Sequence, residues 1–105
     1  MNLTEQKCVP CEIGGEPMKD EEIQLNLANI PTWSLVDGKL FKKLTFKDFK
    51  EVLVFVNKIG ELAESEGHHP DIALSYGSVA ITLSTHAVGG LSYNDFILAA
   101  KIDVL

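Results

Sequence analysis

The 105-residue sequence has few cysteines, no cluster of basic residues and no long apolar run. Two cysteines, Cys8 and Cys11, are too few for the disulfide framework of a small secreted domain, so we expect a reducing cytoplasm. Because 9 Lys and Arg stand against 15 Asp and Glu, for a net charge of -6, we expect no nucleic acid and no membrane as partner. No apolar stretch reaches the ~18 residues of a membrane-spanning helix, and the N-terminus lacks a signal-peptide core.

The sequence is long enough for one domain with a modest core, and its composition is that of a globular protein, with 46% hydrophobic residues. Residues 1–18 are polar and interrupted by Pro and Gly, so we expect an irregular N-terminal arm before a single domain over residues 19–105. Cys8-x-x-Cys11 has the spacing of half a zinc site or of a redox pair. Since neither a second cysteine pair nor a βαβ setting is present, a surface arm is the favoured interpretation.

The first part of the domain predicts a short helix and a hairpin. Three acidic residues begin the segment Asp20–Asn29, which suits the positive end of a helix dipole. Apolar runs then flank Asp37-Gly38. Such a pair favours a β-hairpin, because a type I′ turn needs positive φ at both central residues.

A long helix is predicted next, opened by a capping box at Thr45-x-x-Asp48 and closed by Gly67. Its apolar residues follow at three- and four-residue steps: Phe46, Phe49, Val52, Leu53, Val56, Ile59 and Ala63. Residues 53–56 are apolar on every side, so we expect part of this helix to pack against another subunit.

Two strands and a last helix complete the pattern. Residues 71–75 and 78–84 predict strands around Tyr76-Gly77, and His86 would stand at the end of the second strand if the chain stays extended. Gly89-Gly90 breaks the chain before a second capping box at Ser92-x-x-Asp95. The apolar stripe of the last helix is formed by Phe96, Ile97, Ala100 and Val104.

The predicted order is therefore α-β-β-α-β-β-α. Short connections within each strand pair make the sheet antiparallel, with the helices packed on one face. The sequence predicts an α+β fold with a four-stranded antiparallel sheet.

All three histidines fall between residues 68 and 86. Since an imidazole, with its ordinary pKa near ~6.5, can both take and give a proton at neutral pH, we interpret His68, His69 and His86 as one acid–base site. A solvated connection at His68-His69 and a three-imidazole metal site are the open alternatives. Tyr76 fits either a ligand contact or a strand-end core residue.

The residues from Glu64 to Asp95 resemble the signature of pterin-4a-carbinolamine dehydratases. The matching pattern is Glu64-x-x-x-His68-His69-Pro70, then Tyr76, His86 and Asp95, with the runs 46–49, 81–86 and 90–95. The resemblance covers roughly residues 20–105, and its spaced positions are far more specific than a lone short motif.

This resemblance implies removal of water from 4a-hydroxytetrahydropterin to give quinonoid dihydropterin, which recycles the tetrahydrobiopterin-type cofactor of aromatic amino-acid hydroxylases. It implies no metal and no organic cofactor. It also implies a homodimer or homotetramer, which we expect to form through the long helix and a sheet edge. Some relatives act as dimerisation cofactors or are linked to molybdopterin, so a non-catalytic pterin-binding, molybdopterin-binding or dimerisation module is the alternative.

The resemblance also implies roles for individual residues. His68 and His86 match the acid/base positions, and His69, taken with them as catalytic, matches a position that binds and orients the pterin. The segments expected to contact substrate are Gly67, His68, His69, Ser84, Thr85, His86 and Ala87. Asp95 is expected to hold a histidine or the loop, Glu64 to give similar support, and Trp33 to wall the pocket. A capping role alone for Asp95 and a solvated position for Glu64 remain open.

The residues support an elimination independently of the resemblance. Hydroxide is a poor leaving group, so an acid must protonate the oxygen on C4a while a base takes the proton of the adjacent N5. Two histidines on opposite sides of the ring meet that requirement.

Overall fold

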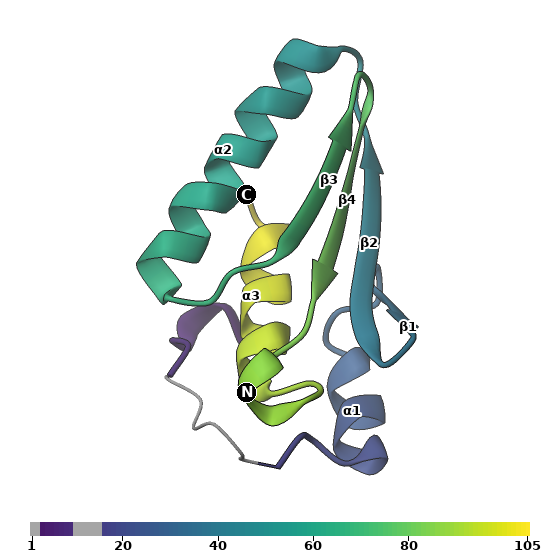
Figure 1. Cartoon of the computed structure of the whole chain (residues 1–105), viewed down its shortest axis with the longest axis vertical. Helices are drawn as coiled ribbons and strands as arrows, with labels where there is room; N and C mark the ends of the chain where they lie inside the picture. The colour runs from purple at the N-terminus through teal and green to yellow at the C-terminus, as the bar shows by residue number, and fades with distance from the viewer. Residues whose placement is uncertain (1–2, 10–15) are drawn as a thin grey trace.

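A four-stranded antiparallel sheet with helices α2 and α3 on one face forms the body of the protein (Figure 1). This computed structural model describes residues 3–9 and 16–105. The elements are α1 (Asp20–Leu27), β1 (Ser34–Val36), β2 (Lys39–Thr45), α2 (Phe49–Glu66), β3 (Asp71–Ser75), β4 (Ser78–Leu83) and α3 (Tyr93–Asp103). The predicted α+β class and element order are confirmed.

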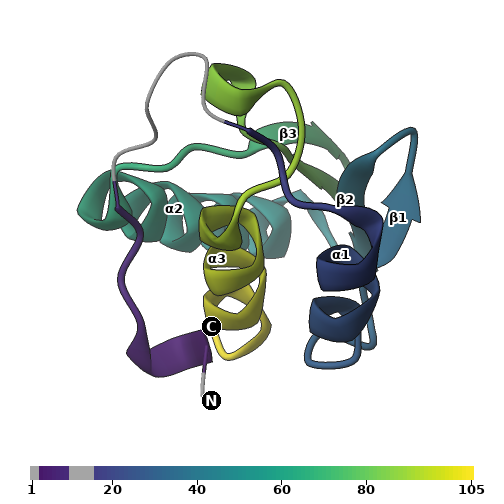
Figure 2. The same cartoon turned by 90° about the horizontal axis from the view of Figure 1, so that it is seen from below.

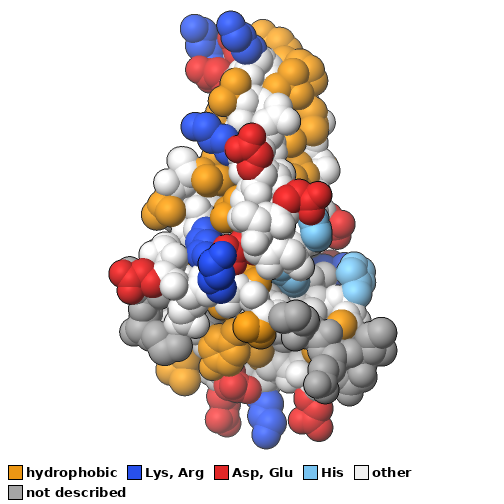
Figure 3. Space-filling model, turned by 90° about the vertical axis from the view of Figure 1, so that its left-hand side faces the viewer, with side chains coloured by type: hydrophobic (Ala, Val, Ile, Leu, Met, Phe, Trp, Pro, Cys, Tyr) orange, Lys and Arg blue, Asp and Glu red, His pale blue; other side chains and the backbone are white. Residues whose placement is uncertain are grey.

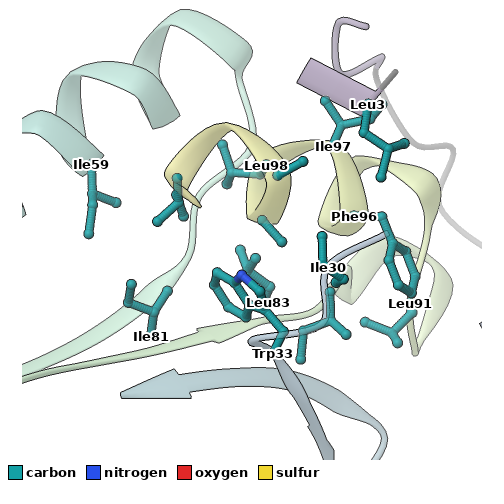
Figure 4. Close-up of a cluster of buried hydrophobic side chains, with 14 of the residues drawn as sticks. Leu3, Ile30, Trp33, Ile59, Ile81, Leu83, Leu91, Phe96, Ile97 and Leu98 are labelled. Atoms are coloured by element: carbon teal, nitrogen blue, oxygen red, sulfur yellow. The ribbon is translucent and has the colours of Figure 1, made fainter. Parts of the chain in front are cut away.

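The sheet has the strand order β1-β2-β4-β3, so β2 and β4 are central and β1 and β3 are edges. The register places Leu40 opposite Leu83. Along β4, Val79, Ile81 and Leu83 are fully buried, as the predicted alternation requires. These side chains pack under the helices in the core that Figure 4 draws around Ile81 and Leu83.

The turn between β1 and β2 has the predicted geometry. Asp37 has φ 51° and Gly38 has φ 75°, so both central residues lie in the left-handed region. A type I′ turn matches the right-handed twist of the two strands, which confirms the predicted hairpin.

Helix α2 begins later than the sequence analysis predicted. Asp48 is its N-cap, and its Oδ1 accepts the backbone N–H of Glu51 at 2.9 Å. The prediction of Thr45 as the cap, with Phe46 inside the helix, is wrong. Thr45 instead pairs with Ser78 in the sheet, and the N–H of Phe46 bonds to the carbonyl of Gly77, because the sheet continues through these residues.

Helix α3 is the centre of the core. Its residues 94–100 and Ile102 are buried, because the helix lies between the sheet, α2 and the N-terminal turn (Figures 2 and 4). The predicted stripe therefore underestimates how much of this helix is covered. Val104 is wrong as a member of it, since this residue follows the helix and is 71% exposed.

The described part of the N-terminal arm is docked on the domain. Leu3–Glu5 form a 3₁₀ turn, and Leu3 is buried beside Ile97 (Figure 4). Cys11 and the Gly14-Gly15 pair lie outside the described residues, so the Cys8-x-x-Cys11 interpretation and the arm boundary stay predictions. No helix within residues 3–9 and 16–105 has the length and apolarity needed to cross a bilayer.

Candidate functional site

The three histidines line one pocket of about 300 Å³, where α2 ends and the loop after β4 begins. Figure 3 shows histidine side chains gathered on one face of the molecule. All seven residues expected to contact substrate line this pocket: Gly67, His68, His69, Ser84, Thr85, His86 and Ala87. Two residues that the sequence analysis did not name, Val9 and Asn94, complete the wall.

The first side of the pocket is positioned by the end of α2. Gly67 has φ 68°, and its N–H bonds to the carbonyl of Ala63 at 2.9 Å, which confirms the predicted helix stop. The N–H of His68 reaches the same carbonyl at 3.3 Å. The chain therefore leaves the helix at a fixed angle, with His68 and His69 at the exit.

The second side is positioned by a closed loop. Strand β4 ends at Leu83, and the N–H of Thr85 bonds to the carbonyl of Gly90 at 2.8 Å. This bridge encloses a 3₁₀ turn, His86–Val88, that ends at Gly89 with φ 69°. The chain is thus not extended at His86, and the turn, not a continued strand, brings that residue to the pocket.

Asp95 forms hydrogen bonds to both sides of the pocket. It is fully buried at the start of α3, and its Oδ1 lies 2.6 Å from Nε2 of His68. Its Oδ2 accepts the hydroxyl of Thr85 at 2.7 Å and the N–H of Ser92 at 3.0 Å, the acidic half of the predicted capping box. Because a carboxylate only accepts, Nε2 of His68 donates, and Nδ1 is the ring nitrogen left for proton exchange.

The hydroxyl groups extend this network. Oγ1 of Thr85 lies 2.8 Å from Oγ of Ser92. Since Thr85 gives its proton to Asp95, the hydroxyl of Ser92 donates to Thr85. The loop that carries His86 is therefore tied to the same buried carboxylate as His68.

The other predicted residues differ in their placement. Nε2 of His69 lies 2.7 Å from Oε2 of Glu64, and both side chains are exposed, so the pair contributes little to stability. Trp33 is not brought to the pocket: it is buried elsewhere, and its Nε1 donates to Asp103 at the far end of α3. Tyr76 is exposed in the turn between β3 and β4, so it is neither a core residue nor part of this pocket.

The N-terminal arm reaches the pocket through Asn94. Its Oδ1 accepts the N–H of Val9 at 2.9 Å, and its Nδ2 donates to the carbonyl of Val9 at 2.5 Å. The signature gave no sign of this contact, because the arm lies outside it. No pattern in the sequence points to it, because Val9 and Asn94 are 85 positions apart.

The carboxylate of Glu66, whose side chain is 4% exposed, holds Cys8, the residue before Val9 in the arm. Its Oε1 accepts the N–H of Cys8 and its Oε2 accepts Nζ of Lys101, both at 2.9 Å. The Cys8 N–H above all, then the Lys101 ammonium, hold the pKa of Glu66 below its usual value. Burial, with the charge of Glu66, raises the pKa of the Cys8 thiol to about 12, so this thiol stays protonated at neutral pH and is a poor nucleophile.

Two further features bear on the alternatives. Across residues 3–9 and 16–105, no three His, Cys, Asp or Glu side chains are grouped so that they could hold a metal ion. A second hollow, of about 400 Å³, shares Ser84, Thr85 and His86 but contains neither His68 nor His69. Of these two hollows the smaller is the better candidate, because three imidazoles line it and only one lines the other.

Comparisons with known proteins agree on one family. The profile described as "Pterin 4 alpha carbinolamine dehydratase" matches residues 16–105. A relative from Alkaliphilus metalliredigens is 48% identical over 104 residues, covering 97% of this chain and 94% of the relative. One from Chlorobaculum tepidum is 46% identical over 107 residues, covering 98% and 96%. Both are provisionally named pterin-4-alpha-carbinolamine dehydratases.

The solved structures similar to this chain include the two described next. A transcriptional coactivator/pterin dehydratase from Brucella melitensis aligns with a TM-score of 0.80 and 27% identity, covering 85% of this chain and 97% of that one. A pterin dehydratase-like protein, described as a RuBisCO assembly factor in the alpha-carboxysome, aligns with a TM-score of 0.56 and 26% identity. That alignment covers 69% of this chain and 83% of the other.

Proposed function

The chain belongs to the pterin 4 alpha carbinolamine dehydratase family, and we propose that it converts 4a-hydroxytetrahydropterin to quinonoid dihydropterin and water. The observation that carries the proposal is the single pocket lined by His68, His69 and His86. This dehydratase would recycle a tetrahydrobiopterin-type cofactor. The substrate class is a pterin, a planar bicyclic ring with several hydrogen-bonding edges.

The reaction breaks the C4a–O bond and forms a double bond between C4a and N5. An acid gives a proton to the departing hydroxyl, which leaves as water, and a base takes the proton from N5. The electron pair of the N5–H bond becomes the new double bond. Proton transfers alone complete this balance, so the proposed reaction needs neither a metal nor an organic cofactor.

His68 and His86 are the proposed acid–base pair. His68 is fixed through Nε2 by Asp95, which leaves Nδ1 to exchange a proton with the substrate. His86 is exposed and has no side-chain hydrogen bond to any residue that the structure describes, so substrate is free to bond to either ring nitrogen. His69, which is paired with Glu64 and lines the pocket, is the residue proposed to bind and orient the ring.

We also propose that copies of this chain associate as a dimer or tetramer through α2 and a sheet edge. Phe49 and Leu53, one turn apart on α2, are 40% and 41% exposed, and neighbouring exposed apolar side chains of this kind can form an association surface. Figure 3 shows hydrophobic side chains gathered toward the end of the molecule where α2 begins. Strand β3 pairs with β4 on one side and is an edge strand, so it offers backbone groups for pairing.

The setting proposed for this reaction is a reducing cytoplasm. A protonated Cys8 thiol is compatible with it. An aromatic amino-acid hydroxylase is the class of enzyme that supplies a 4a-hydroxypterin, and we propose a metabolic link to such an enzyme.

A non-catalytic module is the second candidate function. The observation that favours it is the similarity to a pterin dehydratase-like protein described as an assembly factor. In that case the pocket binds a pterin or molybdopterin without turnover, or α2 bridges partner proteins and substitutions of the histidines leave function unchanged.

Stopped-flow absorbance of the 4a-carbinolamine, with and without the full chain, separates the two candidates. The dehydratase accelerates loss of the carbinolamine in proportion to protein concentration. Quenching of pterin fluorescence without any acceleration would establish a binder and overturn the enzyme.

A further inference from the structure

We infer that Val9 of the N-terminal arm is an apolar, substrate-binding wall of the histidine pocket, and that Asn94 is the positioning residue that holds it there. The inference rests on the proposed function, because it names a contact to the same pterin. It concerns an arm that lies outside the signature residues and that the sequence alone left without a function.

The arm is fixed to the domain by buried partners. Asn94 is buried, and its amide makes both hydrogen bonds that a neighbouring strand would make to Val9. The next residue back, Cys8, is bonded through its N–H to Glu66 and places its sulfur 3.6 Å from the carbonyl of Asn94. The last turn of α2 and the first turn of α3 thus hold two successive residues of the arm.

A backbone held on both sides leaves only the side chain of Val9 free to serve a ligand. Val9 is 65% exposed, although its side chain is a branched apolar group and its backbone is bonded to the domain. It lines the pocket together with His68, His69 and His86. A binding pocket commonly combines a few polar groups with apolar surface, and Val9 supplies apolar surface that the three imidazoles do not.

The chemistry of the ligand fits this arrangement. The histidines exchange protons and hydrogen bonds with the edge atoms of a pterin, whereas the faces of its flat ring gain free energy from apolar contact. In this inference Val9 contacts the ring away from the reacting C4a and N5 atoms. Such a contact is equally strong in the ground state and in the transition state. Val9 therefore acts on substrate binding and raises affinity without changing the chemical step.

Replacement of Val9 by Ala tests this contact, with Val104→Ala as the matched control. Val104 is 71% exposed, similar to Val9, and lies outside the pocket lining. In the full chain, Val9→Ala raises both KM for the carbinolamine and Kd for 7,8-dihydropterin by about 3- to 10-fold, because apolar contact area is lost. It leaves kcat within about twofold, and Val104→Ala changes none of the three.

Asn94→Leu tests the positioning role. We expect it to raise Kd for 7,8-dihydropterin at least as much as Val9→Ala, because the arm loses both bonds that fix it. If Asn94→Leu folds poorly, an NMR measurement on the unsubstituted chain still tests the inference. In the unsubstituted chain, saturation with 7,8-dihydropterin shifts the methyl NMR signals of Val9 by the ring current of the bound pterin, and leaves those of Val104 unmoved.

The outcomes separate the two proposals. If Val9→Ala binds 7,8-dihydropterin with unchanged affinity, or if the Val9 methyl signals do not move at saturation, the pocket-wall inference is overturned. The proposed dehydratase function is not affected by either result. Binding that weakens in Val9→Ala, in a protein without turnover, overturns the dehydratase and supports the wall. A chain that does not bind 7,8-dihydropterin at all contradicts both.

Discussion

At the scale of single residues, Asp95 is the buried group on which the pocket depends. Its two oxygens accept hydrogen bonds from His68, Thr85 and the backbone of Ser92, so one carboxylate fixes the His68 ring, the loop of His86 and the start of α3. A buried acceptor with three donors is costly to alter, because each donor that loses it is left unsatisfied.

Asp95→Asn is expected to lower both stability and turnover. The amide keeps one acceptor oxygen and adds a donor, so at least one buried donor loses its partner, at a cost of about 1–3 kcal/mol. It also no longer fixes the tautomer of His68, which lowers kcat by about 10- to 100-fold, less than the loss of a general acid or base. Urea unfolding and steady-state kinetics measure the two effects.

Asp48→Ala is the matched control for that substitution. It removes the N-cap of α2, far from the histidines, and costs about 1 kcal/mol. Its kcat should stay unchanged. Equal losses of kcat in both variants would mean that destabilisation, not the His68 contact, explains the Asp95 result.

The sequence predicted the residues of this site better than their contacts. His68, His69 and His86 were grouped because all three are imidazoles within a short span, and the loop residues were predicted from the family resemblance; all of them line the pocket. Val9 and Asn94 were not found, because a hydrogen bond between residues 85 positions apart leaves no periodic trace in the chain. Trp33 was misplaced for the same reason, because its hydrogen-bond partner, Asp103, is 70 positions away in the sequence.

At the scale of elements, the glycine inside α2 and the glycine that ends it are expected to respond in opposite ways to the same substitution. Gly60 lies inside the helix, where an added Cβ has nothing within 4 Å. Gly67 ends the helix with φ 68°, also in open space. The same substitution thus tests backbone conformation alone, without steric conflict.

We expect Gly60→Ala to stabilise the protein by about 0.5–1 kcal/mol, because alanine restricts the unfolded chain and favours the helix. Gly67→Ala should destabilise it by about 1 kcal/mol, because an L-residue is strained in the left-handed region. Urea unfolding at one protein concentration measures both. Equal signs for the two variants would contradict the helix boundary at Gly67.

Element types were predictable from the sequence, whereas some boundaries were not. The Asp37-Gly38 turn and the Gly67 stop were predicted because each depends on a local backbone conformation that few residues adopt. The start of α2 was missed because Thr45 has two competing uses, and pairing with Ser78 across the sheet prevails over a helix cap. The strand pairing of Thr45 becomes apparent only once the position of β4 is known.

At the scale of the whole molecule, the exposed flank of α2 predicts self-association. Leu53→Asp places a charge on that flank, so we expect the variant to sediment as a smaller species than the unsubstituted chain. Leu25→Asp on α1, where the leucine is even more exposed, is the control and should leave the sedimentation coefficient unchanged. If the unsubstituted chain itself sediments as a monomer, the proposed interface is contradicted.

The most direct test of the account is the turnover of His86→Ala in the carbinolamine assay, beside Tyr76→Ala as an exposed aromatic control outside the pocket. If the imidazole exchanges a proton with the substrate, kcat falls by about 10²- to 10⁴-fold while circular dichroism shows an intact fold. The Tyr76 variant should keep its full rate. Undiminished kcat in a folded His86→Ala protein would contradict acid–base catalysis by this pocket.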